Sequence, residues 1–380
     1  MLNLLISAVA LAAPVEFAPE AQIRPRVEAH NGKDGAVGGN EVFVSQRARI
    51  GGTLAQGPIS ARVVVQDVRT WGEETDAVTD YSADGFDLYV GYLTWKPSEN
   101  LGLHVGRQSL PIQGQRLVAA AGWAQQERRY DGARLTWKVK DFSGDVIGVV
   151  VADNVTDAHD DSSVFGVVRA GWGADANVVD LLYIPLSDAS RNRLTHTVGF
   201  YTKGATGIVS GRLESYLQKG RRDGRRELAG MVGARGAVAP NVAAKPRFTL
   251  FYDHLTGESS SGDFVENTFD PLFGARHKFY GFMDVMIVSV GGTQDLRGLQ
   301  DAALKFDVTP IDELKVGLDA HMFLPSAALN GGSVLGRELD LTAKVAVTEG
   351  FNVSAGASVL SRPNAELDLF TYLMLDAFLK

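Results

Sequence analysis

The chain has 380 residues, a formal net charge of −8 and no cysteine, so disulfide bonds and thiolate metal sites are excluded and general nucleic-acid binding is disfavoured. Its hydrophobic content of 45% is too low for a bundle of membrane helices, and no internal run approaches the roughly 20 apolar residues that each such helix needs. The length suits either two or three soluble domains or one large sheet, and no linker or low-complexity segment divides it.

The amino terminus has the features of a secretory signal peptide. Leu2–Ala13 is a short apolar run, and Ala10-Leu11-Ala12 is a suitable small-residue cleavage site. The positive charge that normally precedes the apolar run is missing, so a buried first strand or helix of a soluble protein is the competing interpretation. We expect residues 1–13 to be a signal peptide and residues 14–380 to form one barrel domain.

From Val42 onward, the chain consists of segments about ten residues long in which every second residue is apolar. In Arg337–Val347, for example, Leu339 and Leu341 alternate with Glu338 and Asp340. Side chains of a strand point alternately to its two faces, so each segment predicts a strand with one apolar and one polar face. Eighteen strands are predicted, the first of them weakly: Ala21–Ala29, Glu41–Thr53, Ile59–Arg69, Phe86–Lys96, Leu101–Ser109, Tyr130–Val139, Asp145–Asp153, Val164–Trp172, Val178–Leu186, Leu194–Lys203, Ile208–Lys219, Glu227–Val238, Arg247–Leu255, Leu299–Thr309, Leu314–Leu324, Arg337–Thr348, Phe351–Leu360 and Leu367–Leu379.

The connections between these strands alternate in length. Tight turns such as Glu349-Gly350 alternate with long connections such as Leu110–Arg129 and Gly257–Gly298. Short periplasmic turns and longer outer loops are typical of outer-membrane barrels, whereas a soluble sandwich has no reason for this rhythm. The predicted fold is therefore all-β: a single transmembrane antiparallel β-barrel of about 18 strands in the bacterial outer membrane.

Alternation also predicts which basic residues line the lumen of such a barrel. Arg47 and Arg49 lie two residues apart, and each would cost ~2–4 kcal/mol against hydrocarbon near the bilayer midplane. The same reasoning assigns a further set to the lumen: Arg62, Arg134, Arg212, Arg235, Lys305, Lys315 and Lys344. Arginine binds a carboxylate through two parallel hydrogen bonds, so this lumen suits an anion. The competing interpretation is that these cations pair with luminal carboxylates and only brace the wall.

Two charged connections are further candidates. Arg276, His277 and Lys278 lie in the long connection Gly257–Gly298, whose aromatic content favours an ordered segment that folds over or into the lumen as a constriction. An external lid is the alternative. The basic run Lys219–Arg226 surrounds an Asp-Gly turn at a hairpin tip. It suits an outer loop that bridges lipopolysaccharide phosphates or recruits an anion at the mouth, or else a merely solvated tip.

Several segments, in order, resemble the alginate-export family of outer-membrane barrels. The first half contains RARIG at 47–51, QDVR at 66–69, VGRQ at 105–108, GW at 122–123 and YDGARL at 130–135. The second half contains FDPLFG at 269–274, RHKFYGFMD at 276–284, LQD at 299–301 and ELDL at 338–341. The resemblance spans most of residues 40–345 and implies an eighteen-stranded barrel through which an anionic uronate polysaccharide diffuses along an arginine-rich lumen. It also adds Arg107 to the luminal candidates.

We therefore predict a passive channel for an alginate-like polyuronate or related anions. A general or anion-preferring porin without polysaccharide specificity is the alternative, and a barrel-type hydrolase is a weaker one. The seven histidines show no recognisable catalytic spacing, and Asp253-His254 is only a weak candidate dyad, so no catalytic residue, metal or cofactor is expected. The expected partners are the anion, outer-membrane lipid and lipopolysaccharide, and the barrel-assembly machinery, with no nucleic acid.

Overall fold

A computed structural model describes residues 13–31, 41–73, 86–152, 162–174, 176–258, 265–287, 298–327 and 334–379. All but the last residue of the predicted signal peptide lies outside these ranges, so its cleavage stays a prediction. No helix in the described ranges is long and apolar enough to cross a membrane.

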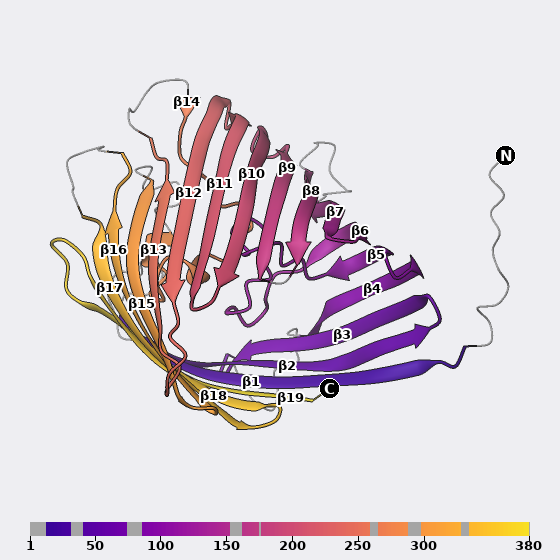
Figure 1. Cartoon of the computed structure of the whole chain (residues 1–380), viewed down its shortest axis with the longest axis horizontal. Coiled ribbons are helices and arrows are strands. Elements are labelled where there is room, and N and C mark those ends of the chain that lie inside the picture. The colour runs from indigo at the N-terminus through magenta and orange to yellow at the C-terminus, as the bar shows by residue number, and fades with distance from the viewer. Residues whose placement is uncertain are drawn as a thin grey trace.

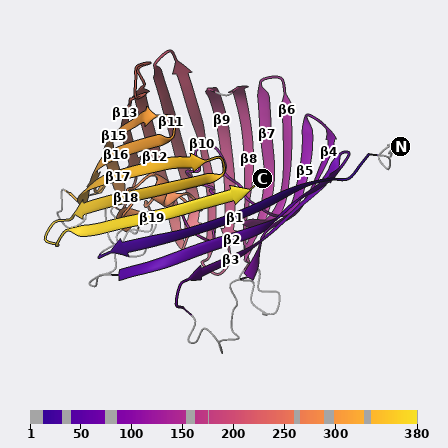
Figure 2. The same cartoon turned by 90° about the horizontal axis from the view of Figure 1, so that it is seen from below.

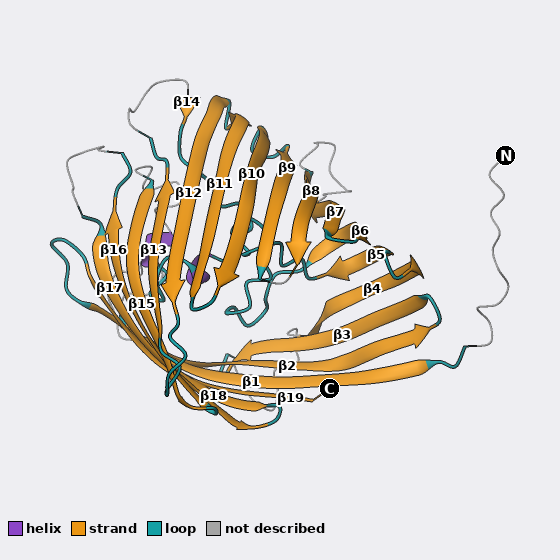
Figure 3. Ribbon diagram, in the orientation of Figure 1, coloured by secondary structure: helices purple, strands orange, loops and turns teal. Residues whose placement is uncertain are grey.

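The described chain is built almost entirely from long strands, and the predicted number of eighteen is confirmed. They are β1 (Glu16–His30), β2 (Glu41–Gln56), β3 (Ile59–Thr70), β4 (Phe86–Ser98), β5 (Leu101–Gln108), β6 (Tyr130–Val139), β7 (Phe142–Ala152), β8 (Ser163–Ala174), β9 (Asn177–Asp188), β10 (Arg193–Thr206), β11 (Val209–Arg222), β12 (Arg225–Val238), β13 (Arg247–Leu255), β15 (Leu299–Ile311), β16 (Leu314–Leu324), β17 (Gly336–Thr348), β18 (Phe351–Ser361) and β19 (Asp368–Leu379). A two-residue strand, β14 (Val265–Glu266), and two short 3₁₀ helices, η3 (Arg276–Lys278) and η4 (Val285–Ile287), lie in the connection between β13 and β15 (Figure 3). The first strand begins at Glu16 and not at Ala21, since Pro19 and Pro25 obscure its alternation but still fit the register with β2.

The sheet closes on itself as a barrel. Each long strand pairs antiparallel with its neighbours in sequence, and β1 closes the ring by pairing with β2 on one side and β19 on the other (Figures 1 and 2). The short strand β14 pairs in parallel with the start of β12. Most short turns lie at one end, which we call the short-turn end and which also holds both ends of the barrel sequence. The long connections lie at the other, the long-loop end, together with the two-residue turn between β11 and β12.

The barrel turns its apolar face outward. In β11, Leu213 and Leu217 are exposed, whereas Glu214 and Gln218 are completely buried on the inner face. A soluble barrel would show the reverse, so this polarity is that of a membrane barrel, as predicted. The buried apolar cluster lies inside the barrel and includes Leu117, Phe251 and Phe279, because two connections fold inward and pack there.

Candidate functional site

Two connections meet inside the lumen. The first inner loop, residues 109–129, joins β5 to β6; the second inner loop is residues 265–287, within the connection between β13 and β15. They pair through backbone hydrogen bonds, from the Phe273 amide to the Leu117 carbonyl (2.9 Å) and from the Ala275 amide to the Gln115 carbonyl (3.0 Å). The second loop was expected to fold over or into the lumen; the contribution of the first was not foreseen.

The wall holds the second inner loop at two places. The amide of Gln218 on β11 bonds the backbone of Asp270 in both directions, at 2.7 and 2.9 Å, and Arg193 on β10 pairs with the Asp270 carboxylate at 2.7 Å. Burial alone would raise the pKa of Asp270, but Arg193 and Arg222 outweigh it and hold this pKa below its ordinary value.

At its other end, the second inner loop is held by Glu338 on β17. The Met283 amide donates to the Glu338 carboxylate at 2.8 Å. Gly281, two residues earlier, has φ +81°, and a Cβ atom there would collide with the same carboxylate. The glycine of the FYGFMD segment is therefore required both by the left-handed backbone and by the close approach to the wall.

One cluster of arginines lies on β1 and β2 beneath the first inner loop. Arg47 and Arg49 both pair with Glu127, at 2.8 and 3.3 Å, and Arg129 contacts the same carboxylate. Arg24 has no carboxylate partner among the described residues and donates instead to the backbone carbonyls of residues 122, 123 and 124, at 2.9 to 3.2 Å. These arginines thus fasten the first inner loop to the wall.

A second cluster lies deeper, around Arg116. This side chain is almost completely buried and contacts Glu214 at 3.0 Å, Asp253 at 2.6 Å and the Tyr280 hydroxyl at 3.0 Å. Its guanidinium also lies 3.6 Å from the Phe279 ring centroid. Arg116 therefore links the first inner loop to β11, to β13 and to the second inner loop.

Two cations beside this cluster have no ion pair with a described residue. Arg235 on β12 lies over the Phe251 ring at 4.2 Å, and its Nε and Nη2 atoms are buried without a hydrogen-bond partner. Lys278 donates only to the Gly114 carbonyl, at 3.2 Å. Burial and the neighbouring cations Arg212, Arg235 and Arg116 lower the pKa of Lys278 below its ordinary value.

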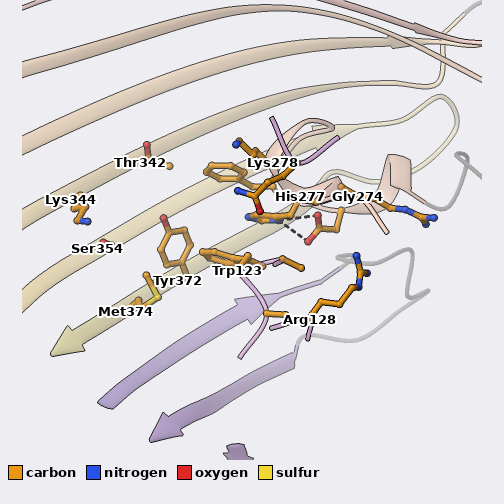
Figure 4. A pocket seen from close by; sticks show the side chains of 18 of the residues that line it. Trp123, Arg128, Gly274, His277, Lys278, Thr342, Lys344, Ser354, Tyr372 and Met374 are labelled. Atoms are coloured by element: carbon orange, nitrogen blue, oxygen red, sulfur yellow. Dashed lines mark hydrogen bonds and ion pairs between the residues drawn. The ribbon is translucent and has the colours of Figure 1, made fainter. Parts of the chain in front are cut away.

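An aromatic stack joins the two inner loops to each other (Figure 4). The rings of Trp123 and His277 are parallel, with centroids 4.3 Å apart, and Phe282 continues the stack 4.8 Å from His277. Arg26 covers Trp123 at 4.1 Å, and Asp284 accepts from the His277 ring at 2.8 Å. Both faces of the Trp123 ring are therefore occupied by protein.

A cavity of about 710 Å³ opens beside this stack and extends along the wall toward the short-turn end. Its described lining contains five lysines or arginines and two carboxylates: Arg128, Arg276, Lys278, Lys315, Lys344, Asp284 and Asp307. Asp284 is engaged with His277, and Asp307 lies 3.3 Å from Lys315. Lys344 lines the cavity from the barrel wall and Lys278 from the second inner loop (Figure 4). The cavity therefore carries a positive excess.

The other predicted luminal residues lie on the inner face, most of them paired. Arg62 contacts Glu20 at 2.7 Å, and Arg134 contacts Asp145 at 2.7 Å. Arg212 pairs with Glu214 at 2.8 Å, and Lys305 pairs with Asp319. No ion pair joins Lys344 to a described residue. Much of the wall thus has the braced arrangement that was the competing interpretation.

Arg107 must be corrected, because it lies on the outer face of the barrel. It shares that face with the exposed Val105 and forms a two-pronged pair with Asp131, at 2.8 and 2.9 Å, and a longer contact with Asp87 at 3.6 Å. Its assignment to the lumen rested on a family-like motif, whereas alternation along β5 places it with Val105. Its position beside the long-loop end and its acidic partners make the outward orientation tolerable.

Sequence reasoning missed several luminal residues. Arg24 and Arg26 repeat the spacing of Arg47 and Arg49 and lie within the predicted strand Ala21–Ala29, so the same alternation, applied to that strand, would have found them. Arg116 and Arg128 lie in a connection with no periodicity, and only its length of about twenty residues marks it as unusual.

The candidate catalytic dyad has no geometric basis. Asp253 lies on the inner face against Arg116, whereas His254 follows it in the strand and lies on the opposite face. Within the described ranges, no group of three or more His, Asp or Glu side chains is arranged to hold a metal ion.

The sequence model of the alginate export family matches residues 16–365. A search of curated proteins gives no significant match. Many solved structures share the fold at low identity, and three of those that cover nearly the full length serve as examples. They are Acinetobacter baumannii OccAB4 (TM-score 0.66, 14% identity, 97% of this chain and 99% of that chain), a BenF-like porin from Pseudomonas fluorescens Pf-5 (0.63, 11%, 96% and 98%) and Pseudomonas aeruginosa OccK2 (OpdF), solved in complex with glucuronate (0.63, 11%, 96% and 98%).

Proposed function

This chain belongs to the alginate export family of outer-membrane channels, and from that premise we propose that it passively conducts an anionic, alginate-like polysaccharide or related anions. The observation that carries the proposal is the positive excess of the cavity beside the inner loops, with five basic and two acidic side chains. A polyuronate carries one carboxylate per sugar, so such a cavity lowers the barrier for its passage. The complex of OccK2 with glucuronate shows that a barrel of this fold can hold a uronate.

The luminal basic residues divide into two roles in this proposal. Lys278 and Lys344 have no carboxylate partner among the described residues and are available to a passing anion. Arg47, Arg49 and Arg134 already contact carboxylates, so their main effect is to fix the inner loops and the wall, with a smaller contribution to the luminal potential. Arg276, His277 and Lys278 belong to the segment that we propose as the constriction.

A general porin is the second candidate, because so many wall cations are neutralised by neighbouring carboxylates. The discriminating experiment is single-channel conductance of the purified protein in a planar bilayer, with anion/cation selectivity and block by added polyuronate. We expect anion selectivity and dose-dependent block.

The double variant Lys278→Gln/Lys344→Gln should weaken the block about tenfold. Each exposed cation–carboxylate contact contributes ~0.2–1 kcal/mol, so the loss of two contacts can reach the ~1.4 kcal/mol that corresponds to a factor of ten. Arg221→Gln/Arg226→Gln removes the same charge from the outer face and serves as the matched control. An unselective channel that polyuronate does not block would favour the general porin. Equal block in the variant and the control would disprove the role of the cavity cations.

A further inference from the structure

The hairpin of β11 and β12 separates its basic residues between the two faces of the barrel. Arg222 and Arg225 point inward, where Arg222 pairs with Glu227 and Arg225 pairs with Glu258 and Glu266, the latter two at 3.0 and 2.9 Å. Lys219, Arg221 and Arg226 are exposed on the outer face, and no ion pair joins them to a described residue. We call these three residues the cationic rim patch.

The patch continues the lipid-facing surface of the same strands. Arg221 follows Leu213 and Leu217 on the outer face of β11, and Arg226 precedes Leu228 and Val232 on the outer face of β12; these four apolar side chains are 41–50% exposed. The two-residue turn at Asp223 and Gly224, both with positive φ, lies directly above. The cations therefore project sideways from the rim and not into the mouth, which argues against recruitment of the luminal solute.

The depth of the patch matches that of lipid headgroups. Lys219 and Arg221 lie two and four residues beyond Leu217; a rise of about 3.3 Å per residue along a strand tilted ~40° places them roughly 5 and 10 Å above it. Each headgroup region extends roughly 5–7 Å beyond the hydrocarbon core, so with Leu217 taken as the edge of the core, Lys219 lies at headgroup depth and Arg221 at the outer limit of this layer. Tyr183 on β9, on the same outer face, bonds at 2.8 Å to His196, which lies opposite Lys219 in the register of β10 and β11.

No described residue supplies the patch with a counter-charge. Arg221 and Arg226 are directly opposite each other in the register of β11 and β12, and like charges in that position destabilise a sheet. Elsewhere on the outer face, Arg107 is neutralised by Asp131 and Asp87. We propose that the cationic rim patch binds the phosphate groups of a phosphorylated glycolipid in the outer leaflet, of the lipid A type. This site is independent of the solute that the lumen conducts.

The test is native mass spectrometry of the full chain in detergent with added lipid A. The wild type should bind bis-phosphorylated lipid A at least tenfold more tightly than the dephosphorylated form. Arg221→Gln/Arg226→Gln should lose about tenfold in affinity for the phosphorylated form. The matched control Lys245→Gln/Arg247→Gln removes the same charge at the short-turn end and should bind as the wild type does. A heat-dependent shift in gel mobility verifies folding, and the single variant Arg221→Gln replaces the double one if the latter does not fold.

Several outcomes would overturn the proposal. Equal affinity for the two forms of lipid A, or unchanged binding by the rim variant, would remove the phosphate contact. Displacement of lipid A by millimolar inorganic phosphate would indicate a simple anion site, and displacement by polyuronate would indicate recruitment of the solute. The rim variant should keep the wild-type polyuronate block, so failure of this proposal and failure of the channel proposal give different results.

Discussion

Replacing Arg116 by methionine should release the first inner loop from the barrel wall while the barrel itself stays folded. Methionine retains an unbranched apolar side chain but leaves Asp253 buried without its ion-pair partner and Glu214 with Arg212 alone. Removing one partner of a buried ion pair typically costs ~3–5 kcal/mol. The strands keep their backbone hydrogen bonds, so this cost falls on the local contact between loop and wall. The population of the opened loop should then rise roughly 100-fold to several-thousand-fold, at 1.4 kcal/mol per factor of ten.

Hydrogen exchange measured by mass spectrometry on the full chain reports this opening. The amides of Phe273 and Ala275 bond the first inner loop and should exchange faster by that factor, whereas amides within β11 should not change. Arg107→Met is the matched control, because it removes the same side chain from an exposed pair worth ~0.2–1 kcal/mol. Wild-type exchange in Arg116→Met, or an equal increase in Arg107→Met, would refute the reasoning that the buried ion pairs hold the loops.

Three further predictions concern the loop and the wall. Burial and neighbouring cations lower the pKa of Lys278, so in bilayer recordings the polyuronate block should weaken as the pH rises, at pH values below those at which an ordinary lysine loses its proton. Lys278→Arg should abolish this pH dependence, because arginine keeps its charge. Gly281→Ala should cost at least ~1–2 kcal/mol of loop stability and speed exchange near Glu338, whereas Gly236→Ala, with no atom within 4 Å of the added methyl group, should not. Ile50→Arg should cost ~2–4 kcal/mol in urea unfolding from vesicles, since this side chain is 65% exposed on the outer face of the barrel; a neutral result would contradict the assigned outer face.

The sequence by itself determined the barrel and most of its faces. A period of two is a local property, readable within a single strand, so the number of strands and the inward orientation of Arg47 and Arg134 followed from alternation and from the cost of charge in lipid. The family was equally visible in ordered motifs. The prediction was wrong at Arg107, where the family-like motif was preferred to alternation. It was also wrong at the start of β1, where prolines obscure the alternation.

Only the tertiary structure decided what the inward charges contact. Arg116 contacts Asp253, which is 137 residues away in the sequence, and Arg47 contacts Glu127, which is 80 residues away. These contacts form because closure of the barrel brings their strands and loops together. Periodicity is silent about such contacts, since a connection without regular structure has no repeating pattern to read. The packing of the inner loops inside the closed sheet therefore decides which luminal cations are braced by ion pairs and which stay free. The same packing leaves the positive cavity beside these loops.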